Sequence, residues 1–318
     1  MEKEKKIVNH VMSRDIPSGI FSAILEYFKE FGSDEFSHVS SVTPIPNADI
    51  YHYHRPHLEE TLNQNSICTV HHDLSDPDPW HSKIKFIPRY MEASAIICLN
   101  NTQKRILMEQ GIAENKLFVI PHGYNDRVLH LKPIKTIDDK ITIGLASKRY
   151  GRRVKGEAFL LELAKRLDPQ HFRFIFVGQN RTISSNRLKD LGFEAHSYER
   201  LPYKMFQSFY ESIDILLMCS SHEGGPANIP EALATGTPIF SSKIGIPNDV
   251  IVDGENGLFL TLDPDIDANK ILNVCIENPI LLQNIIKNAR SSKNLAITWA
   301  QCISNNLDVY KKILEGRL

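Results

Sequence analysis

The 318-residue chain lacks the features that mark membrane-spanning, secreted or nucleic-acid-binding proteins. No apolar run reaches 18 residues, so we expect no transmembrane helix. The chain has 37 basic against 38 acidic residues, and this balance favours no nucleic-acid partner. Its charged start, MEKEKKIVNH, predicts no secretory signal. We therefore expect a cytoplasmic protein.

Cysteine is scarce and forms no recognisable pairs. The five cysteines contain no C-x-x-C motif, and four of them lie inside apolar stretches. Such residues are typical of small buried side chains in a reducing compartment. The histidines of YHYHRPH (51–57) have no companion cluster with zinc-ligand spacing. We therefore expect neither a disulfide framework nor a metal site.

Short apolar runs alternate with amphipathic segments along the whole chain. Runs such as FRFIFVG and DILLMCS are apolar almost throughout, which is typical of parallel strands covered by helices on both faces. The sequence therefore predicts an α/β fold with two doubly wound, Rossmann-like parallel-sheet domains. The predicted strands are 5–12, 36–43, 48–54, 66–72, 94–100, 117–121, 140–147, 172–178, 214–220 and 238–242.

Helical patterns lie between several of these strands. In the segment 101–111, Asn101 is the predicted N-cap and Gly111 the terminator. A polar, proline-containing segment at 130–140 separates the halves, so we predict domains over 1–134 and 135–297. The predicted helices are 19–31, 101–111, 157–167, 203–212, 229–235 and a terminal helix at 298–318.

The most informative stretch is SSHEGGPANIPEALATGTPIF (220–240), which follows a predicted strand. In doubly wound sheets, ligands bind beyond the carboxyl ends of the strands. Here Glu223 and Glu231 flank a Gly-Gly-Pro loop that leads into a helix. Glycines allow close backbone approach, a helix N-terminus suits an anion, and carboxylates accept bonds from sugar hydroxyls. A nucleotide sugar needs these elements together.

A structural explanation of the same residues stays open. Glu231 stands three residues after Asn228, which is capping-box spacing, so it could cap its own helix with Asn228 as N-cap. Glu223 could be a solvated loop carboxylate.

The segment EGGPANIPEALATGTPIFSSKIGIPNDVIVDGENGLFL resembles the donor-binding region of retaining GT-B glycosyltransferases of the family 4-like group. The shared pattern is E-x7-E, E-A-x-A-x-G-x-P, a glycine-bearing turn and D-G-x-x-G. Weaker similarities are GLASKRYGRRVKG, TVHHDL, PSGIFSAIL and the terminal helix, which in that family packs back on the first domain. The resemblance implies a GT-B fold, with its two domains facing a cleft, and sugar transfer from a nucleotide-diphosphate sugar to a hydroxyl with retention of configuration.

The resemblance also assigns residues. Glu231 matches the glutamate that holds the ribose hydroxyls, and Glu223 matches the one that contacts the donor sugar. Lys155 matches the lysine at the leaving diphosphate, where basic side chains can replace a metal. The other donor or catalytic positions are Arg149 or alternatively Arg152, His71 or alternatively His72, Gly19, Gly224, Gly225, Ala227, Asn228 and Ile229. Pro226 departs from the common glycine at its position and removes one N–H donor.

These assignments predict a metal-independent glycosyltransferase of polysaccharide biosynthesis, without a cofactor besides its donor. The expected acceptor is a glycan or a lipid-linked precursor. The stretch PWHSKIKFIPRYME joins Trp80, Ile84, Phe86 and Ile87 to Lys83, Lys85 and Arg89, which favours peripheral contact with the inner face of a membrane. An ordinary, partly buried loop and helix is the alternative for it.

Two other functions stay open. One is a non-catalytic GT-B protein that binds a sugar nucleotide or supports a partner subunit. The other is a different GT-B enzyme, such as a nucleotide-sugar epimerase or a phosphorylase.

Overall fold

The computed structural model describes residues 5–12, 19–80, 83–134, 139–149 and 151–318. Its contacts divide the chain into two compact units, which are Met1–Gly123 with Ile297–Leu318 and Tyr124–Ala296. The division falls after Gly123, whereas the sequence composition placed the boundary near residue 134. The reason is that Tyr124 and Leu129 are buried in a core of the second unit.

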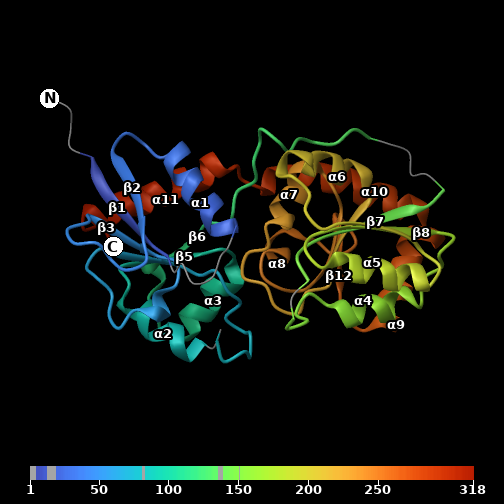
Figure 1. Ribbon diagram of the computed structural model, residues 1–318, viewed down its shortest axis with the longest axis horizontal. Helices are drawn as coiled ribbons and strands as arrows, with labels where there is room; N and C mark the ends of the chain where they lie inside the picture. The colour runs from blue at the N-terminus through green and yellow to red at the C-terminus, as the bar shows by residue number, and fades with distance from the viewer. Residues whose placement is uncertain (1–4, 13–18, 81–82, 135–138, 150) are drawn as a thin grey trace. The chain divides into compact units, whose positions relative to one another are not determined.

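The first unit contains a six-stranded parallel sheet in the order β2-β1-β3-β4-β5-β6 (Figure 1). The chain moves outward from β1 to β2 and then crosses to β3 on the other side, so the sheet is doubly wound. Its strands are β1 (Lys6–Val11), β2 (Phe36–Ser41), β3 (Ile50–Tyr53), β4 (Ser66–Thr69), β5 (Ala95–Cys98) and β6 (Leu117–Val119).

Helices cover both faces of this sheet. One face packs against α1 and α11, which lie side by side in Figure 1, and the other packs against α2 and α3. A capping box, in which Thr298 and Gln301 bond each other's backbone N–H groups, starts α11. The helices are α1 (Gly19–Phe31), α2 (Lys83–Glu92), α3 (Asn101–Glu109) and α11 (Trp299–Leu314), with 3-10 turns η1 (Pro56–Leu58) and η2 (Glu114–Lys116).

The second unit has a parallel six-stranded sheet in the order β12-β11-β10-β7-β8-β9. The chain moves from β7 outward to β9, then returns to the other side of β7 and continues from β10 to β12. Its strands are β7 (Ile141–Ala146), β8 (Phe172–Val177), β9 (Glu194–Tyr198), β10 (Ile215–Met218), β11 (Ile239–Ser242) and β12 (Gly257–Leu260).

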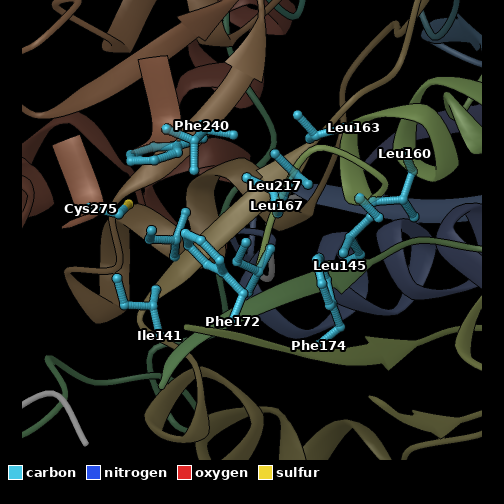
Figure 2. Packing of buried hydrophobic residues seen from close by; sticks show 14 of the residues in the cluster. Ile141, Leu145, Leu160, Leu163, Leu167, Phe172, Phe174, Leu217, Phe240 and Cys275 are labelled. Carbon is cyan, nitrogen blue, oxygen red and sulfur yellow. The ribbon is translucent and has the colours of Figure 1, made fainter. Parts of the chain in front are cut away.

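Two apolar cores hold helices on the faces of this sheet. One core joins it to α4, α5, α9 and α10, and Figure 2 shows Phe172 and Phe174 of β8 with Leu160 and Leu163 of α4 in it. The other core contains α6, α7 and α8. The elements are α4 (Glu157–Ala164), α5 (Arg181–Asp190), η3 (Tyr203–Met205), α6 (Phe206–Ser212), α7 (Asn228–Thr235), α8 (Pro247–Val250), α9 (Pro264–Leu272), the π-helix η4 (Asn273–Glu277), α10 (Pro279–Ser291) and η5 (Ser292–Leu295).

The predicted fold class is confirmed, and all ten predicted strands are present with ends that differ by a few residues. Three local predictions need correction. The N-cap of α3 is Asn100, whose side chain accepts from the Gln103 N–H, and not Asn101. The helix predicted at 203–212 is a 3-10 turn followed by a shorter α-helix. The strands β9 and β12 were not predicted at all.

Within the described part of the chain, we find no helix with the length and hydrophobicity needed to span a membrane.

Candidate functional site

The predicted donor residues gather where the second sheet changes direction. Strands β7 and β10 are neighbours, yet the chain leaves them toward opposite edges of the sheet. Their carboxyl ends therefore form the topological switch point, which is where doubly wound sheets bind ligands. The loop after β7 carries Lys155, and the loop after β10 carries Glu223.

Backbone contacts hold these two loops together. The Ser221 N–H donates to the Val154 carbonyl at 2.8 Å. Next to Lys155, Gly156 adopts a left-handed conformation (φ +73°) at the start of α4, and a Cβ there would lie 2.1 Å from the Cys219 carbonyl oxygen. Only glycine permits this approach. The position of Lys155 beside the β10 loop thus depends on Gly156.

Lys155 and Glu223 form an ion pair at this point. The Lys155 ammonium donates to Oε1 of Glu223, and the Ser220 hydroxyl donates to the same oxygen at 2.7 Å. Both charged side chains are nearly buried, with 13% and 11% exposed. A pair that is largely shielded from water interacts more strongly than a surface pair. The interpretation of Glu223 as a solvated loop carboxylate is therefore wrong.

Glu231 is held by side chains from two other elements, the 3-10 turn η3 and helix α6. Its carboxylate accepts from the Tyr203 hydroxyl at 3.0 Å and from the Tyr210 hydroxyl at 2.9 Å. The capping-box alternative is wrong, because α7 begins at Asn228 itself and its N-cap, Ala227, makes no side-chain capping bond. The carboxylate therefore points to two phenols and not back to the helix N-terminus.

Burial raises the pKa of Glu231 to about 7, although the hydrogen bonds from Tyr210 and Tyr203 act in the opposite direction. A carboxylate that is costly to keep ionised gains from additional donors. A ligand that offers two hydroxyl groups would supply such donors.

The other predicted residues of this unit lie near the same loops. Ile229 is fully buried in the core of this unit, so its side chain is not available to a ligand. The Arg149 N–H donates to the Gln179 carbonyl at 3.0 Å, and Arg152 is exposed. The described contacts of Glu223 include neither arginine, so the choice between them stays open. The loop between the glutamates carries Gly224, Gly225, Ala227 and Asn228 and ends at the first residue of α7.

Sequence reasoning missed three residues of this site. Tyr203 lies in the 3-10 turn η3 and Tyr210 on α6, and no pattern around the two glutamates marks either of them. Arg181 is fully buried and donates to the carbonyl and the hydroxyl of Ser147 at 2.7 and 2.6 Å. It thereby fixes the start of the basic loop that carries Lys155. Nothing in the local sequence indicates that partner.

In the first unit, the adjacent histidines follow β4 and face different surroundings. Nε2 of His71 lies 2.9 Å from Nδ1 of His54, whereas the His72 ring centroid lies 3.8 Å from that of Phe86. The backbone around them is fixed by Gln103 of α3, whose amide donates to the Val70 and His72 carbonyls. Gly19 is the first residue of α1, and only Pro17 and Ser18 of the stretch PSGIFSAIL lie outside the described residues.

The raised pKa of Glu231 predicts a measurable effect of pH on stability. Between about pH 4.5 and 7 the folded state keeps a proton that the unfolded state releases, so the stability contributed by this group falls as pH rises. We expect Glu231→Gln to become more stable relative to the wild type by on the order of 3 kcal/mol between pH 5 and 8. Chemical unfolding of both proteins at each pH measures this difference.

A second variant checks the cause of the shift. Tyr210→Phe removes one of the two donors that lower the pKa of Glu231. The pH range over which the stability contributed by Glu231 falls should therefore shift to higher pH. Glu211→Gln on neighbouring α6 serves as the control and should follow the wild type. If the difference in free energy of unfolding between the wild type and Glu231→Gln does not vary with pH, the raised pKa of Glu231 is contradicted.

Residues 130–292 match the family model described as glycosyl transferases group 1. An uncharacterized glycosyltransferase of Methanocaldococcus jannaschii is 23% identical over 223 residues, which cover 69% of this chain and 60% of the relative. The UDP-Gal:alpha-D-GlcNAc-diphosphoundecaprenol alpha-1,3-galactosyltransferase of Escherichia coli is 24% identical over 277 residues, 72% of this chain and 69% of the relative. The chain thus spans less than two thirds of the archaeal relative.

The fold is similar to solved structures. Anabaena HepE, crystallised in complex with UDP and glucose, has a TM-score of 0.71 at 15% identity, covering 96% of this chain and all of HepE. This likeness shows that the two parallel sheets and their helices form the GT-B fold. The family match covers just over half of the chain, including the whole switch-point site. The chain therefore belongs to the family of glycosyl transferases group 1.

Proposed function

We propose that this protein transfers a sugar from a nucleotide-diphosphate sugar to a hydroxyl acceptor, with retention of configuration and without a metal ion. The contact of Lys155 with Glu223 at the switch point between β7 and β10 carries the proposal. It joins a cation suited to a leaving diphosphate with a carboxylate suited to sugar hydroxyls. HepE, which has the same fold, was crystallised with UDP and glucose, and this supports a nucleotide sugar as the donor.

Each residue has a role that follows from its surroundings. Glu231, next to the N-terminal turn of α7, accepts bonds from the ribose hydroxyls in addition to those from Tyr203 and Tyr210. Glu223 holds the transferred sugar. When the donor binds, Lys155 turns from Glu223 to the diphosphate oxygens, and Arg149 or Arg152 adds a second positive charge.

The reaction needs two charge movements. The bond between the anomeric carbon and the diphosphate breaks, and its electron pair stays with the diphosphate, where Lys155 stabilises the growing charge. The acceptor hydroxyl attacks from the same face and gives its proton to a leaving phosphate oxygen. His71, on the loop after β4, is the proposed hydrogen-bonding partner at the reaction centre.

The competing functions are less well supported. A protein that only binds sugar nucleotides would not need a lysine that is held beside the sugar-binding carboxylate by a dedicated glycine. An epimerase or phosphorylase would use the same fold, and only its products would distinguish it.

The first test is a product analysis with a panel of nucleotide sugars and a glycan or glycolipid acceptor, followed by NMR of the new linkage. We expect the donor's anomeric configuration in the product and unchanged rates in EDTA. Lys155→Met should lower kcat by about 10²–10³-fold, because the leaving group loses a positioned cation. The exposed Lys189→Met on α5 is the matched control and should retain wild-type rates.

Each result has a distinct contrary outcome. An inverted product would contradict the same-face mechanism, and full inhibition by EDTA would contradict metal independence. Conversion of the donor without an added acceptor would favour an epimerase.

We propose that the acceptor is a lipid-linked glycan, which the protein meets at a membrane surface. The E. coli relative is named for transfer to a diphosphoundecaprenol-linked sugar. Around α2, Trp80 is 70% exposed and Ile84 is 80% exposed, and the Lys85 ammonium lies 4.7 Å from the Trp80 ring centroid. Apolar groups beside lysines suit an interface with anionic lipids. Phe86, which was predicted to join this surface, is buried and packs instead against His57 and His72.

Liposome sedimentation tests this surface. The wild type should bind vesicles with anionic lipids more strongly than neutral vesicles, and salt should weaken the binding. The double variant Ile84→Asp, Lys85→Glu should lose most of it. Ile280→Asp, which alters an isoleucine that is equally exposed on α10 of the other unit, is the control. Equal binding of both variants would contradict the proposal.

A further inference from the structure

Histidines gather on one face of the first sheet, outside the donor site. The β1–β3 register pairs His10 with His52, and the β1–β2 register pairs Val8 with His38. Because alternate residues of a strand share a face, His38, His10, His52 and His54 point to the same side. This is the side covered by α1 and α11, since Phe28 lies 4.5 Å from the His10 ring and Tyr310 bonds His52.

Three of these rings, those of His38, His10 and His54, form a continuous hydrogen-bonded chain with His71. Nδ1 of His38 lies 3.0 Å from Nε2 of His10. Nδ1 of His10 lies 3.1 Å from Nε2 of His54, and Nδ1 of His54 lies 2.9 Å from Nε2 of His71. The chain thus runs across strands β2, β1 and β3 to the loop after β4. It ends on the residue assigned to the reaction centre.

A metal ion does not explain this cluster well. Ring nitrogens of His10, His52 and His54 lie within 4.8 Å of one another. However, the His52 and His54 rings are stacked with centroids 4.3 Å apart and planes 20° apart, so their lone pairs lie in nearly parallel planes, an arrangement that does not suit joint binding of one ion. Both nitrogens of His52 are also bonded, at 2.6 Å to Tyr310 and at 2.7 Å to Thr69.

The N–H protons in this hydrogen-bonded chain of four histidines can be counted. Burial lowers the pKa of His38 to about 4 and that of His54 to about 3, and it places the pKa of His10 and His71 well below the usual value, so all four rings are neutral at pH 7. Four neutral imidazoles carry four N–H groups, and the three contacts use three of them. The fourth proton must sit on the outer nitrogen of one end, at Nε2 of His38 or Nδ1 of His71.

The His38 end disfavours that proton. Its Nε2 is buried and has no hydrogen-bond acceptor among the described residues, so an N–H there would be an unsatisfied donor. A Cβ built on Gly32 would lie 3.0 Å from both Nε2 and Cδ2 of His38, so this edge of the ring packs closely against Gly32.

We propose that the chain His38–His10–His54–His71 locks His71 in the Nδ1–H tautomer, so that His71 meets a ligand as a hydrogen-bond donor. In this arrangement every ring donates from Nδ1 to Nε2 of the next ring. His54 is then a positioning residue that acts through His71. Burial is the main cause that lowers the pKa of His71, and like-charge repulsion from His54, His122, His72 and Arg55 acts in the same direction, so the donor is a neutral imidazole.

The inference goes beyond the proposed glycosyltransfer, because it concerns the free protein. A locked Nδ1–H suits an acceptor atom of the ligand, such as a phosphate or sugar oxygen, and excludes His71 as a base at that nitrogen. If the transfer proposal failed, the tautomer prediction would stand unchanged.

The test is long-range ¹H–¹⁵N NMR of the protein labelled at histidine, recorded at pH 7.5 without substrates. We expect His10, His38, His54 and His71 to be neutral Nδ1–H tautomers, with couplings across the three N–H···N bonds. In His54→Gln, His71 should lose its single tautomer and become a mixture. His196→Gln, at an exposed histidine of β9, should leave these signals unchanged.

Several outcomes would overturn the proposal. Nε2–H tautomers, charged rings, or His71 signals that are unchanged in His54→Gln would each contradict it. So would stoichiometric Zn²⁺ binding that shifts the His10 and His54 signals together, because a metal would then occupy the chain. If His54→Gln does not fold, the wild-type spectrum alone shows whether the four histidines carry their protons at Nδ1 or at Nε2.

Discussion

The candidate donor site depends on one close backbone contact. Gly156 approaches the carbonyl of Cys219 so closely that no side chain fits between them. This contact, with the Ser221–Val154 hydrogen bond, aligns the loops that leave β7 and β10. Lys155 and Glu223 then meet with little exposure to water, where their attraction is strong. Without that contact, a flexible basic loop would have no fixed relation to the carboxylate.

Both units place their chemistry at the same topological position. In the second unit the switch point between β7 and β10 carries an ion pair, and in the first the switch point between β1 and β3 carries the histidine chain. The physical means differ. In the second unit an ion pair links the two loops at the switch point. In the first unit the histidines are neutral, because burial makes a charge on them costly.

The fold could be predicted from the sequence because continuous apolar runs report strands that are covered on both faces. The two strands that were not predicted show the limit of this signal. Both lie at the edges of the second sheet, and β9 has exposed residues at alternate positions. The two glutamates stand out by their spacing around the Gly-Gly-Pro loop, whereas Lys155 was assigned through the family resemblance. The partners of Glu231 and His71 could not be assigned in the same way, because they come from other elements: Tyr203 and Tyr210 precede the motif, and His54 lies on a different strand segment.

The histidines show why spacing alone misleads. Read along the chain, YHYHRPH has no companion cluster, yet the sheet brings His10 and His38 beside it from strands that lie earlier in the sequence. Pairing of parallel strands places side by side residues that are tens of positions apart in the sequence. The alternation within β3 indicates which side chains share a face but does not identify their neighbours.

The central claim is that the two glutamates and Lys155 form a nucleotide-sugar site. Thermal unfolding of the wild type and of Glu231→Gln, with UDP-, GDP-, ADP-, CMP- and dTDP-sugars, tests it most directly. A ligand at 100 times its Kd adds about 2.7 kcal/mol of stability, so one nucleotide class should raise the Tm of the wild type by several degrees. The variant, which keeps the tyrosine contacts but loses the acceptor carboxylate, should show little shift. Equal shifts in both proteins, or none with any nucleotide, would contradict the account.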